Sequence, residues 1–472
     1  MSEDIKTVSI VPGLITGLEG EAPAEPTVGS SMIESLGSSQ ALFDGIPEGP
    51  TFDEAVQAYE DGGFSFDPSF EPSGEEGFSF EPTDSETQYA ESGLPLEVSA
   101  PSSVDVSGSE PNQPPIEVPV EKPMETKGIV GLQNMNNTCY ANSTIQLLRA
   151  VPELNVFIMR EDLESVCTDK ESIQAKLIMG YQDLINSMWS AHRPAYVRPM
   201  GFLSIIKDAV KDTVYESFGQ PRQNDSHEYL IYLLDNFHEA LNEKAKSKDV
   251  VPDAPEGSSM TTLATQGWNT FLSRHTSPIV DMFFGLMRKT VECQTCHNKS
   301  YRWETFNVFK IPCNGPNLQD WFKAECAPDT IDEYECLPCR KSVDKRQPAT
   351  TYSHIWRLPS SLFVALKRFQ YDGRKNQTPC PQITGTISLA DHFAPESDHP
   401  SKGWQYECRA IADHHGFGNG GHYSAQIAHP VTNKWWWIDD AMSQSLPEGP
   451  RFGSSNYVLY LRRKTDCVAH EA

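Results

Sequence analysis

Residues 131–142 read Gly131-Leu132-Gln133-Asn134-Met135-Asn136-Asn137-Thr138-Cys139-Tyr140-Ala141-Asn142. They place a cysteine between an asparagine-rich turn and an apolar run over 138–158 that has helical spacing and is interrupted by Pro152. A thiol at a helix N-terminus lies at the positive end of the helix dipole, which favours the thiolate. Because the thiolate is the nucleophilic form, Cys139 is a candidate catalytic residue.

Two downstream blocks contain the partners that such a nucleophile needs. The first is Gly420-Gly421-His422-Tyr423-Ser424-Ala425, and the second is Trp435-Trp436-Trp437-Ile438-Asp439-Asp440. An imidazole takes the thiol proton and later protonates the leaving amine, and a carboxylate orients that imidazole. His422 is therefore the candidate base, with the upstream pair His414 and His415 as its competitor. Asp439 is the candidate orienting group, and Asp440 is the alternative.

Together these blocks resemble those of the ubiquitin-specific protease family, the papain-like deubiquitinating cysteine proteases, over roughly residues 128–464. The family's cysteine box typically reads Gly-Leu-x-Asn-x-Gly-Asn-Thr-Cys-Tyr-x-Asn, so Asn136 stands where glycine is usual. Asparagine is the residue that best tolerates a left-handed backbone after glycine, so we expect the departure to be tolerated. The resemblance also assigns Asn134 to the stabilisation of an oxyanion. A plain turn residue is the alternative interpretation.

The resemblance implies four residues in contact with the substrate: Asp225, His414, Gly421 and Tyr423. Asp225 belongs to Gln223-Asn224-Asp225-Ser226-His227-Glu228-Tyr229, which resembles a family block at the start of a helix. A helix cap is the simpler role for Asp225. His414 precedes a glycine-rich loop suited to cover an extended peptide, and a flexible connection with incidental histidines is the alternative.

Four cysteines form two Cys-x-x-Cys pairs, Cys293 with Cys296 and Cys336 with Cys339. Four thiolates at this spacing suit a closed tetrahedral zinc site with no position left for a catalytic water. A redox dithiol is the alternative. The separation of the pairs fits two hairpins that meet at the tip of a finger-like sheet, with 301–311 as strands between them. We therefore expect structural Zn²⁺, and the resemblance implies no organic cofactor.

The charge of the chain is concentrated near its start. Residues 1–127 contain 26 acidic residues and three lysines, a net charge of −23, whereas the remaining 345 residues contain 39 acidic and 35 basic residues, a net charge of −4. This excess of negative charge argues against nonspecific binding of residues 1–127 to nucleic acid or to anionic membranes, and we expect neither as a partner. The absence of a secretory signal and of a long apolar stretch favours the cytoplasm or nucleus, where cysteines stay reduced.

Residues 1–127 are expected to be disordered, because a segment rich in Glu, Pro, Ser and Gly buries too little apolar surface to offset its chain entropy. Within it, Gly63-Phe64-Ser65-Phe66-Asp67-Pro68 recurs as Gly77-Phe78-Ser79-Phe80-Glu81-Pro82. The two copies are interpreted either as docking motifs for a partner protein or as low-complexity sequence with chance similarity.

Helical patterns at 138–158, 171–190, 200–216 and 224–243 come before short β-rich runs that begin near residue 280, which predicts an α+β protein. The family's architecture fits this order: a helical thumb, a β palm and zinc-bearing β fingers at approximately 285–350, all within a catalytic domain at 128–464. The resemblance implies a thiol-dependent hydrolase that cleaves isopeptide or peptide bonds at the C-terminal glycine of ubiquitin, with ubiquitin and its conjugates as partners. A catalytically inactive ubiquitin-binding scaffold and a protease for another ubiquitin-like modifier are the alternatives.

Overall fold

The structure, a computed structural model, describes residues 126–190, 195–255, 257–340, 346–370, 373–397, 404–418 and 420–464, together with the short strand Ser9–Ile10. The acidic segment that the sequence predicts to be disordered, with its two Phe-Ser-Phe repeats, lies almost wholly outside the described residues. Across the described residues, no helix is long and apolar enough to cross a membrane.

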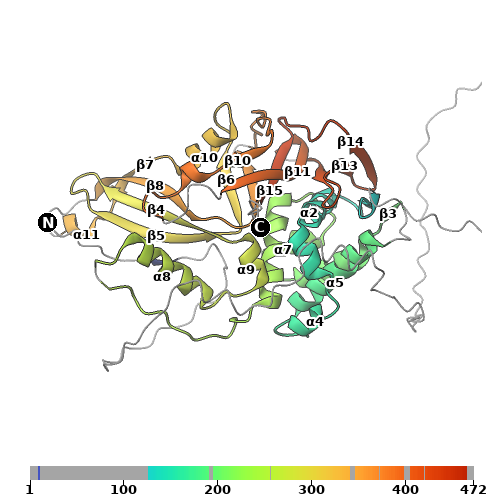
Figure 1. Cartoon of the computed structure of the whole chain (residues 1–472), viewed down its shortest axis with the longest axis horizontal. Coiled ribbons are helices and arrows are strands. Elements are labelled where there is room, and N and C mark those ends of the chain that lie inside the picture. The colour runs from blue at the N-terminus through green and yellow to red at the C-terminus, as the bar shows by residue number, and fades with distance from the viewer. Residues whose placement is uncertain are drawn as a thin grey trace, which may run out of the picture. The chain divides into compact units, whose positions relative to one another are not determined.

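Helices form the first part of the described chain (Figure 1). They are α2 (Cys139–Arg149), α3 (Pro152–Ile158), α4 (Leu163–Val166), α5 (Ile173–Trp189), α6 (Met200–Ala209), the 3-10 helix η2 (Glu216–Gly219) and α7 (Ser226–Leu241). Pro152 is the first residue of α3, where its missing N–H costs no hydrogen bond. The side chains of Ser172 and Asp225 accept hydrogen bonds from backbone N–H groups at the starts of α5 and α7.

An eight-stranded palm sheet follows later in the chain. Its strands are β6 (Val308–Pro312), β9 (Ser361–Lys367), β10 (Thr386–Ser388), β11 (Gln405–Phe417), β12 (Gly420–Ala428), β13 (Trp435–Asp439), β14 (Met442–Leu446) and β15 (Asn456–Arg463). The order is β14-β13-β12-β11-β15-β9-β6, and β10 pairs with β11. Strands β11, β12 and β13 are joined antiparallel, which brings the histidine block and the tryptophan–aspartate block side by side.

A second sheet forms the fingers and extends away from the helices α2, α4 and α5 (Figure 1). Its strands are β1 (Ser9–Ile10), β4 (Gly285–Cys293), β5 (Lys299–Phe306), β7 (Asp329–Tyr334) and β8 (Gln347–Arg357), in the order β1-β5-β4-β8-β7. The remaining helical segments are α8 (Met260–Leu272), α9 (Pro278–Phe283), α10 (Leu318–Cys326), α11 (Leu337–Arg340) and the 3-10 helix η3 (Ala390–His392).

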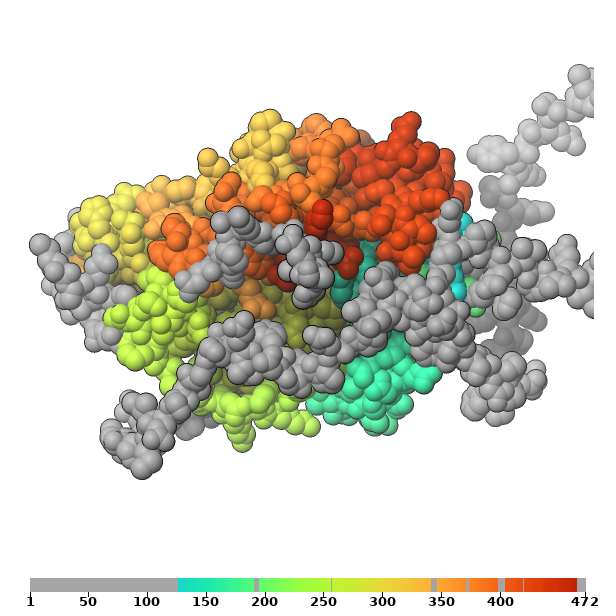
Figure 2. All heavy atoms as spheres, viewed as in Figure 1, coloured from blue at the N-terminus to red at the C-terminus, as the bar shows by residue number. Residues whose placement is uncertain are grey.

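The core places helix α2 where the site is built. Every residue of α2 is buried, because the helix packs against α7 on one side and against β11, β12 and β13 on the other. The largest apolar cluster is accordingly shared by the helices and by the palm. Figure 2 shows the palm strands, in orange and red, on one side of the visible face and the green and teal helices on the other.

Several boundaries differ from those that periodicity predicts. The helix expected over 200–216 ends at Ala209, and η2 follows it separately. The strands expected over 301–311 belong to two sheets: β5 lies in the fingers, whereas β6 pairs with β9 in the palm. The expectation that this whole run connects the two cysteine pairs as finger strands is therefore wrong for β6. The α+β class, with helices first and strands later, is confirmed.

Candidate active site

Cys139 is the first residue of α2, at the end of a tight turn. Asn136 and Asn137 have φ values of 74° and 60°, so the backbone is left-handed where the family usually has glycine. The turn is closed by two hydrogen bonds: Thr138 N–H donates to Oδ1 of Asn134 at 3.1 Å, and Met135 N–H donates to Oγ1 of Thr138 at 2.8 Å. Asparagine at 136 thus supplies the conformation that glycine would supply.

His422 lies on β12, next to two carboxylates at the end of β13. Its Nε2 is 2.5 Å from Oδ1 of Asp439 and 3.9 Å from Oδ2 of Asp440. The contact with Asp439 is a direct hydrogen bond, and it leaves the Nδ1 atom of His422 for a second partner. His415 faces His422 across the β11–β12 pair and is exposed. The geometry therefore favours His422 over His415 as the base, and Asp439 over Asp440 as its orienting group.

Asp440 instead connects the cysteine turn to the palm. Its Oδ2 accepts a hydrogen bond from Nδ2 of Asn134 at 2.9 Å, and its Oδ1 accepts one from Nδ2 of Asn142 at 2.8 Å. Its backbone oxygen accepts from Leu132 N–H at 2.7 Å. A Cβ at Gly131 would lie 2.4 Å from that oxygen, so this approach requires glycine. Sequence reasoning gave Asn142 no role, although a polar residue inside an apolar helical run was a usable signal.

The pKa of the Cys139 thiol is raised, because burial disfavours the thiolate more strongly than the local groups favour it. The negative charge of Asp440 acts in the same direction as burial. Backbone N–H groups of Tyr423, Tyr140 and Cys139 itself lower the pKa, but they do not offset the burial. The helix N-terminus alone therefore does not produce the thiolate that its position suggested, and a proton acceptor is needed.

The sulfur and the imidazole lie on adjoining parts of the same site. The Tyr423 backbone N–H, one residue after His422, is close enough to the Cys139 thiol to lower its pKa. Helix α2, which begins with Cys139, packs on β12, the strand that contains both His422 and Tyr423. Within the described residues no hydrogen bond joins the Cys139 sulfur directly to the His422 ring. The link that the structure describes between the two groups is therefore the backbone of β12 at Tyr423.

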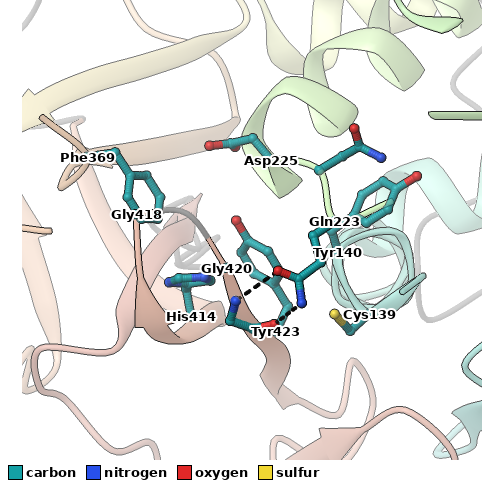
Figure 3. A pocket seen from close by; sticks show the side chains of 11 residues that line it. Cys139, Tyr140, Gln223, Asp225, Phe369, His414, Gly418, Gly420 and Tyr423 are labelled. Atoms are coloured by element: carbon teal, nitrogen blue, oxygen red, sulfur yellow. Dashed lines mark hydrogen bonds between the residues drawn. The ribbon is translucent and has the colours of Figure 1, made fainter. Parts of the chain in front are cut away.

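Cys139 opens into a cavity of about 270 Å³ (Figure 3). Its lining comprises Cys139, Tyr140, Gln223, Asn224, Asp225, Phe369, His414, Gly418, Gly420, Gly421 and Tyr423. All four residues expected to contact the substrate, namely Asp225, His414, Gly421 and Tyr423, are in that lining. A Cβ added at Gly418 would lie 2.2 Å from Gly373 O, and one at Gly421 would lie 2.3 Å from His415 O, so these glycines keep the backbone walls close together.

Two of the lining residues also have structural roles. Asp225 caps α7 by accepting from His227 N–H at 2.7 Å, and its other oxygen accepts from the Tyr457 hydroxyl at 2.6 Å. The ring of His414 packs between Phe369 and Tyr423, at centroid distances of 5.1 and 4.6 Å. Burial is the main cause that lowers the pKa of His414 to about 4, so its ring is neutral at pH 7. Because its pKa is so low, the buried ring of His414 is a weak proton acceptor, which argues against it as the general base.

Gln223 lies two residues before Asp225, and its residue type alone predicts no function. Its amide makes two hydrogen bonds to the backbone of Gly421: Nε2 donates to the Gly421 oxygen at 2.8 Å, and Gly421 N–H donates to Oε1 at 3.0 Å. Figure 3 shows both bonds crossing the cavity beside Cys139. Neither residue type nor spacing predicts such a contact, because it depends on how the α7 entry loop meets β12.

The four cysteines Cys293, Cys296, Cys336 and Cys339 come together at the tip of the fingers, with their sulfurs all within 4.8 Å of one another. The Cys293–Cys339 and Cys296–Cys336 sulfur separations are 3.8 and 3.5 Å. Tetrahedral zinc with Zn–S bonds of about 2.3 Å requires sulfurs about 3.8 Å apart. In this cluster, donor type, donor number and spacing all fit one metal ion.

A second group of potential ligands, His238, Glu239 and His275, lies at the end of α7. Here Nε2 of His238 is 3.1 Å from Nδ1 of His275, and Nδ1 of His238 is 2.8 Å from Oγ of Ser277. Both ring nitrogens of His238 thus already have hydrogen-bonding partners. The group is therefore explained as a polar link between α7 and the start of α9.

Known proteins with similar sequences match the region that contains this site. The family model described as ubiquitin carboxyl-terminal hydrolase matches residues 130–460. Ubiquitin carboxyl-terminal hydrolase Usp2 of Drosophila melanogaster is 28% identical over 349 residues, which cover 72% of this chain and 35% of that protein. Ubiquitin carboxyl-terminal hydrolase 5 of Saccharomyces cerevisiae is 28% identical over 364 residues, which cover 71% of this chain and 45% of that protein. The chain thus spans less than half the length of these relatives.

Solved structures share the fold. The SAGA Ubp8/Sgf11/Sus1/Sgf73 DUB module bound to ubiquitin aldehyde matches with a TM-score of 0.55 and 20% identity, over 73% of this chain and 71% of that one. The same module bound to monoubiquitin matches with a TM-score of 0.55 and 19% identity, over 74% of this chain and 72% of that one. Since the family model covers most of the chain, including the cysteine, histidine and aspartate blocks, this protein belongs to the ubiquitin carboxyl-terminal hydrolase family.

Proposed function

We propose that this protein is a cysteine-type deubiquitinase that hydrolyses isopeptide or peptide bonds at the C-terminal glycine of ubiquitin. One observation carries the proposal: a buried cysteine at a helix N-terminus shares a cavity with β12, the strand that bears His422, and His422 is hydrogen-bonded to Asp439 of β13. Membership of the family supports ubiquitin as the substrate. The solved modules of the same fold that hold ubiquitin are consistent with this assignment.

In the first step, His422 takes the proton of Cys139, and the sulfur attacks the carbonyl carbon of the terminal glycine. The 2.5 Å bond to Asp439 fixes the tautomer of His422 and stabilises the imidazolium that forms. The imidazolium then protonates the departing lysine amine, and a thioester between Cys139 and ubiquitin remains. Because the pKa of the thiol is raised by burial, this transfer to His422 is the source of the thiolate at neutral pH.

The negative oxygen of the tetrahedral intermediate needs hydrogen-bond donors beside the sulfur. Asn134 has one N–H donated to Asp440, and its second N–H is available for this role. We assign the backbone N–H of Cys139 as the second donor, because it lies at the helix N-terminus beside the sulfur. In the second step, His422 activates a water molecule that hydrolyses the thioester and releases the ubiquitin carboxylate.

The cavity walls explain why a glycine-terminated tail would be selected. Gly418, Gly420 and Gly421 supply backbone without side chains, and the aromatic residues Phe369 and Tyr423 supply flat packing surfaces. Extended peptide without side chains fits between such walls, whereas a branched residue would clash with them. We assign Asp225, His414, Gly421 and Tyr423 to this tail-binding channel.

We further propose that Cys293, Cys296, Cys336 and Cys339 bind one structural Zn²⁺ at the tip of the fingers. Four thiolates saturate the metal, so its contribution is to link the β4–β5 turn to the segment between β7 and β8. This link holds the fingers sheet in shape for the globular part of ubiquitin. No catalytic step passes through the metal.

A ubiquitin molecule with an electrophilic C-terminus tests the function directly. The zinc-loaded full chain should form a covalent adduct that is visible as a mass shift, and Cys139→Ala should abolish it. Cys326→Ser, which removes a cysteine of α10 outside both cysteine sites, is the matched control and should react like the wild-type protein.

The same experiment separates the alternatives. A folded wild-type protein that binds ubiquitin but forms no adduct would be a scaffold. An adduct with the probe of another ubiquitin-like modifier, and none with ubiquitin, would assign that modifier as the substrate.

A further inference from the structure

The free edge of β12 lies in the wall of the cavity, beside Cys139. Gly421 pairs with Gly416 of β11 on one edge of β12, whereas β13 pairs with the other edge only from Ala425 onward. The N–H and C=O groups of Gly421 are therefore not satisfied by β13. Such an unpaired edge is where an extended peptide adds as a further strand.

In this structure the amide of Gln223 occupies that edge. A glutamine side chain carries one carbonyl acceptor and an NH₂ donor, as a peptide unit carries C=O and N–H. Its two bonds to Gly421, at 2.8 and 3.0 Å, reproduce the two-point pairing of a neighbouring strand. A Cβ at Gly420 would lie 2.9 Å from Oε1 of Gln223, so glycine at 420 permits this close approach.

The backbone around Gln223 is held in place, whereas its side chain reaches out of the loop. Nδ2 of Asn224 donates to the Ser217 and Arg222 oxygens, and Nδ2 of Asn137 donates to the Pro221 oxygen. Gln223 itself is exposed. A change of side-chain rotamer is thus enough to vacate the edge without moving the loop.

We propose that Gln223 is an internal competitor of the substrate, which holds the channel closed by pairing with Gly421 in place of the ubiquitin tail. This inference rests on the proposed function. The ubiquitin tail must displace the Gln223 amide before its own backbone pairs with β12. The apparent Kd for ubiquitin is therefore the Kd of the open channel divided by the fraction of molecules in which the channel is open. Gln223 is therefore a specificity-determining residue. Only a peptide whose backbone makes both hydrogen bonds to Gly421 compensates for those that the Gln223 amide gives up.

Two substitutions remove the competitor in different ways. Gln223→Ala deletes both bonds, and Gln223→Glu replaces the donor to the Gly421 oxygen with a carboxylate that has none. Both should lower KM for ubiquitin carrying a fluorogenic C-terminal amide by about two- to tenfold, with kcat retained, because each exposed hydrogen bond contributes modestly. Gln220→Ala, the same change at an exposed glutamine outside the cavity lining, should leave KM unchanged.

Binding measured without turnover completes the test. Calorimetry with ubiquitin should give a lower Kd for Cys139→Ala/Gln223→Ala than for Cys139→Ala alone. An unchanged or higher KM and Kd would overturn the proposal. A fall in kcat at unchanged KM would overturn it too, because Gln223 would then position the His422 strand. Adduct formation with the ubiquitin probe is independent of these comparisons, so the deubiquitinase assignment stands or fails separately. Absence of ubiquitin binding by both variants, together with absence of the adduct in the wild-type protein, would reject both proposals.

Discussion

The carboxylate of Asp440 accepts a hydrogen bond from the side-chain amide of Asn134 at 2.9 Å, across 306 positions of sequence. The amide oxygen of Asn134 accepts from Thr138 N–H at 3.1 Å, so both ends of this amide are fixed. Asp440 therefore acts on the proposed chemistry through Asn134, whereas Asp439 acts through His422. The two neighbouring aspartates thus make different contacts, in line with the sequence motif, which favours Asp439 as the orienting group.

This division predicts a non-additive double mutant. Asn134→Ala should lower kcat by about 10²–10³-fold through the lost oxyanion donor. Asp440→Asn should lower it less, by about tenfold, because an amide at 440 offers only one acceptor oxygen to Asn134 and Asn142, which both donate to Asp440. When Asp440→Asn is added to Asn134→Ala, kcat should fall almost no further, because Asp440 acts through the Asn134 amide, which the first substitution has already removed. Steady-state kinetics with a fluorogenic ubiquitin substrate measure all three.

Asp439→Asn is the comparison variant for that cycle. It removes the acceptor that fixes the His422 tautomer, and its loss in kcat should add to that of Asn134→Ala, because the two act on different groups. Additive behaviour of Asn134 with Asp440 would show that Asp440 has a direct role at the imidazole instead.

The reactivity of Cys139 should depend on His422. Burial raises the pKa of the thiol, so a thiolate at neutral pH requires transfer of the proton to the imidazole. In His422→Ala, the midpoint of the pH dependence of Cys139 alkylation by iodoacetamide should move above the ordinary thiol range, whereas the wild-type protein should react near neutral pH. Peptide mass spectrometry distinguishes Cys139 from the other cysteines. An unchanged midpoint in the variant would mean that the helix N-terminus activates the sulfur unaided.

Local sequence signals predicted much of this site because they encode local geometry. The cysteine turn needs left-handed residues, and asparagine at 136 and 137 marks them. The strand Trp435–Asp439 begins and ends where it was expected. The capping role of Asp225 follows from its position before an apolar helical run. In each case a few neighbouring residues determine the conformation.

Contacts between distant segments were not predictable in the same way. The pairing of Gln223 with Gly421 joins residues 198 positions apart, and it depends on the register of β11 against β12 and on the approach of the α7 entry loop. The raised pKa of Cys139 likewise depends on how deeply the palm buries α2, which a helix-dipole argument omits. The division of β5 and β6 between two sheets also depends on tertiary pairing, because β5 pairs with β4 in the fingers and β6 pairs with β9 in the palm.

A buried carboxyl on α7 predicts a pH-dependent stability. Burial, with a further contribution from the charge of Glu239, raises the pKa of Asp235 from an ordinary 3.8 to about 7. The folded protein therefore holds the Asp235 proton more tightly than the unfolded chain does. The contribution of Asp235 to the free energy of unfolding is highest below the ordinary pKa of 3.8, where Asp235 is protonated in both states, and it falls as the pH rises through about 7. Asp235→Asn removes this titration and keeps an oxygen to accept from Asn307, which donates to Asp235 at 2.9 Å.

The variant Asp235→Asn should therefore be more stable than wild type at pH 8, by about 1–3 kcal/mol, and the difference should shrink toward zero near pH 4. Urea unfolding at several pH values measures it. Asp208→Asn, at an exposed position of α6, is the matched control and should show no such trend. Parallel pH profiles for Asp235→Asn and wild type would mean that the folded protein accommodates the charge at 235.

The fingers should depend on their metal. Cys336→Ser removes one of the four sulfurs, and the remaining three hold zinc less tightly, so the zinc content of the purified chain should fall from about one ion toward none. The melting temperature should fall with it, because metal binding contributes directly to folding, and ubiquitin affinity should weaken as the fingers loosen. Elemental analysis, thermal melting and calorimetry measure these effects, with Cys326→Ser as the control that keeps all four sulfurs. Full zinc content in Cys336→Ser would show that the metal ligands are different residues, even if the melting temperature fell.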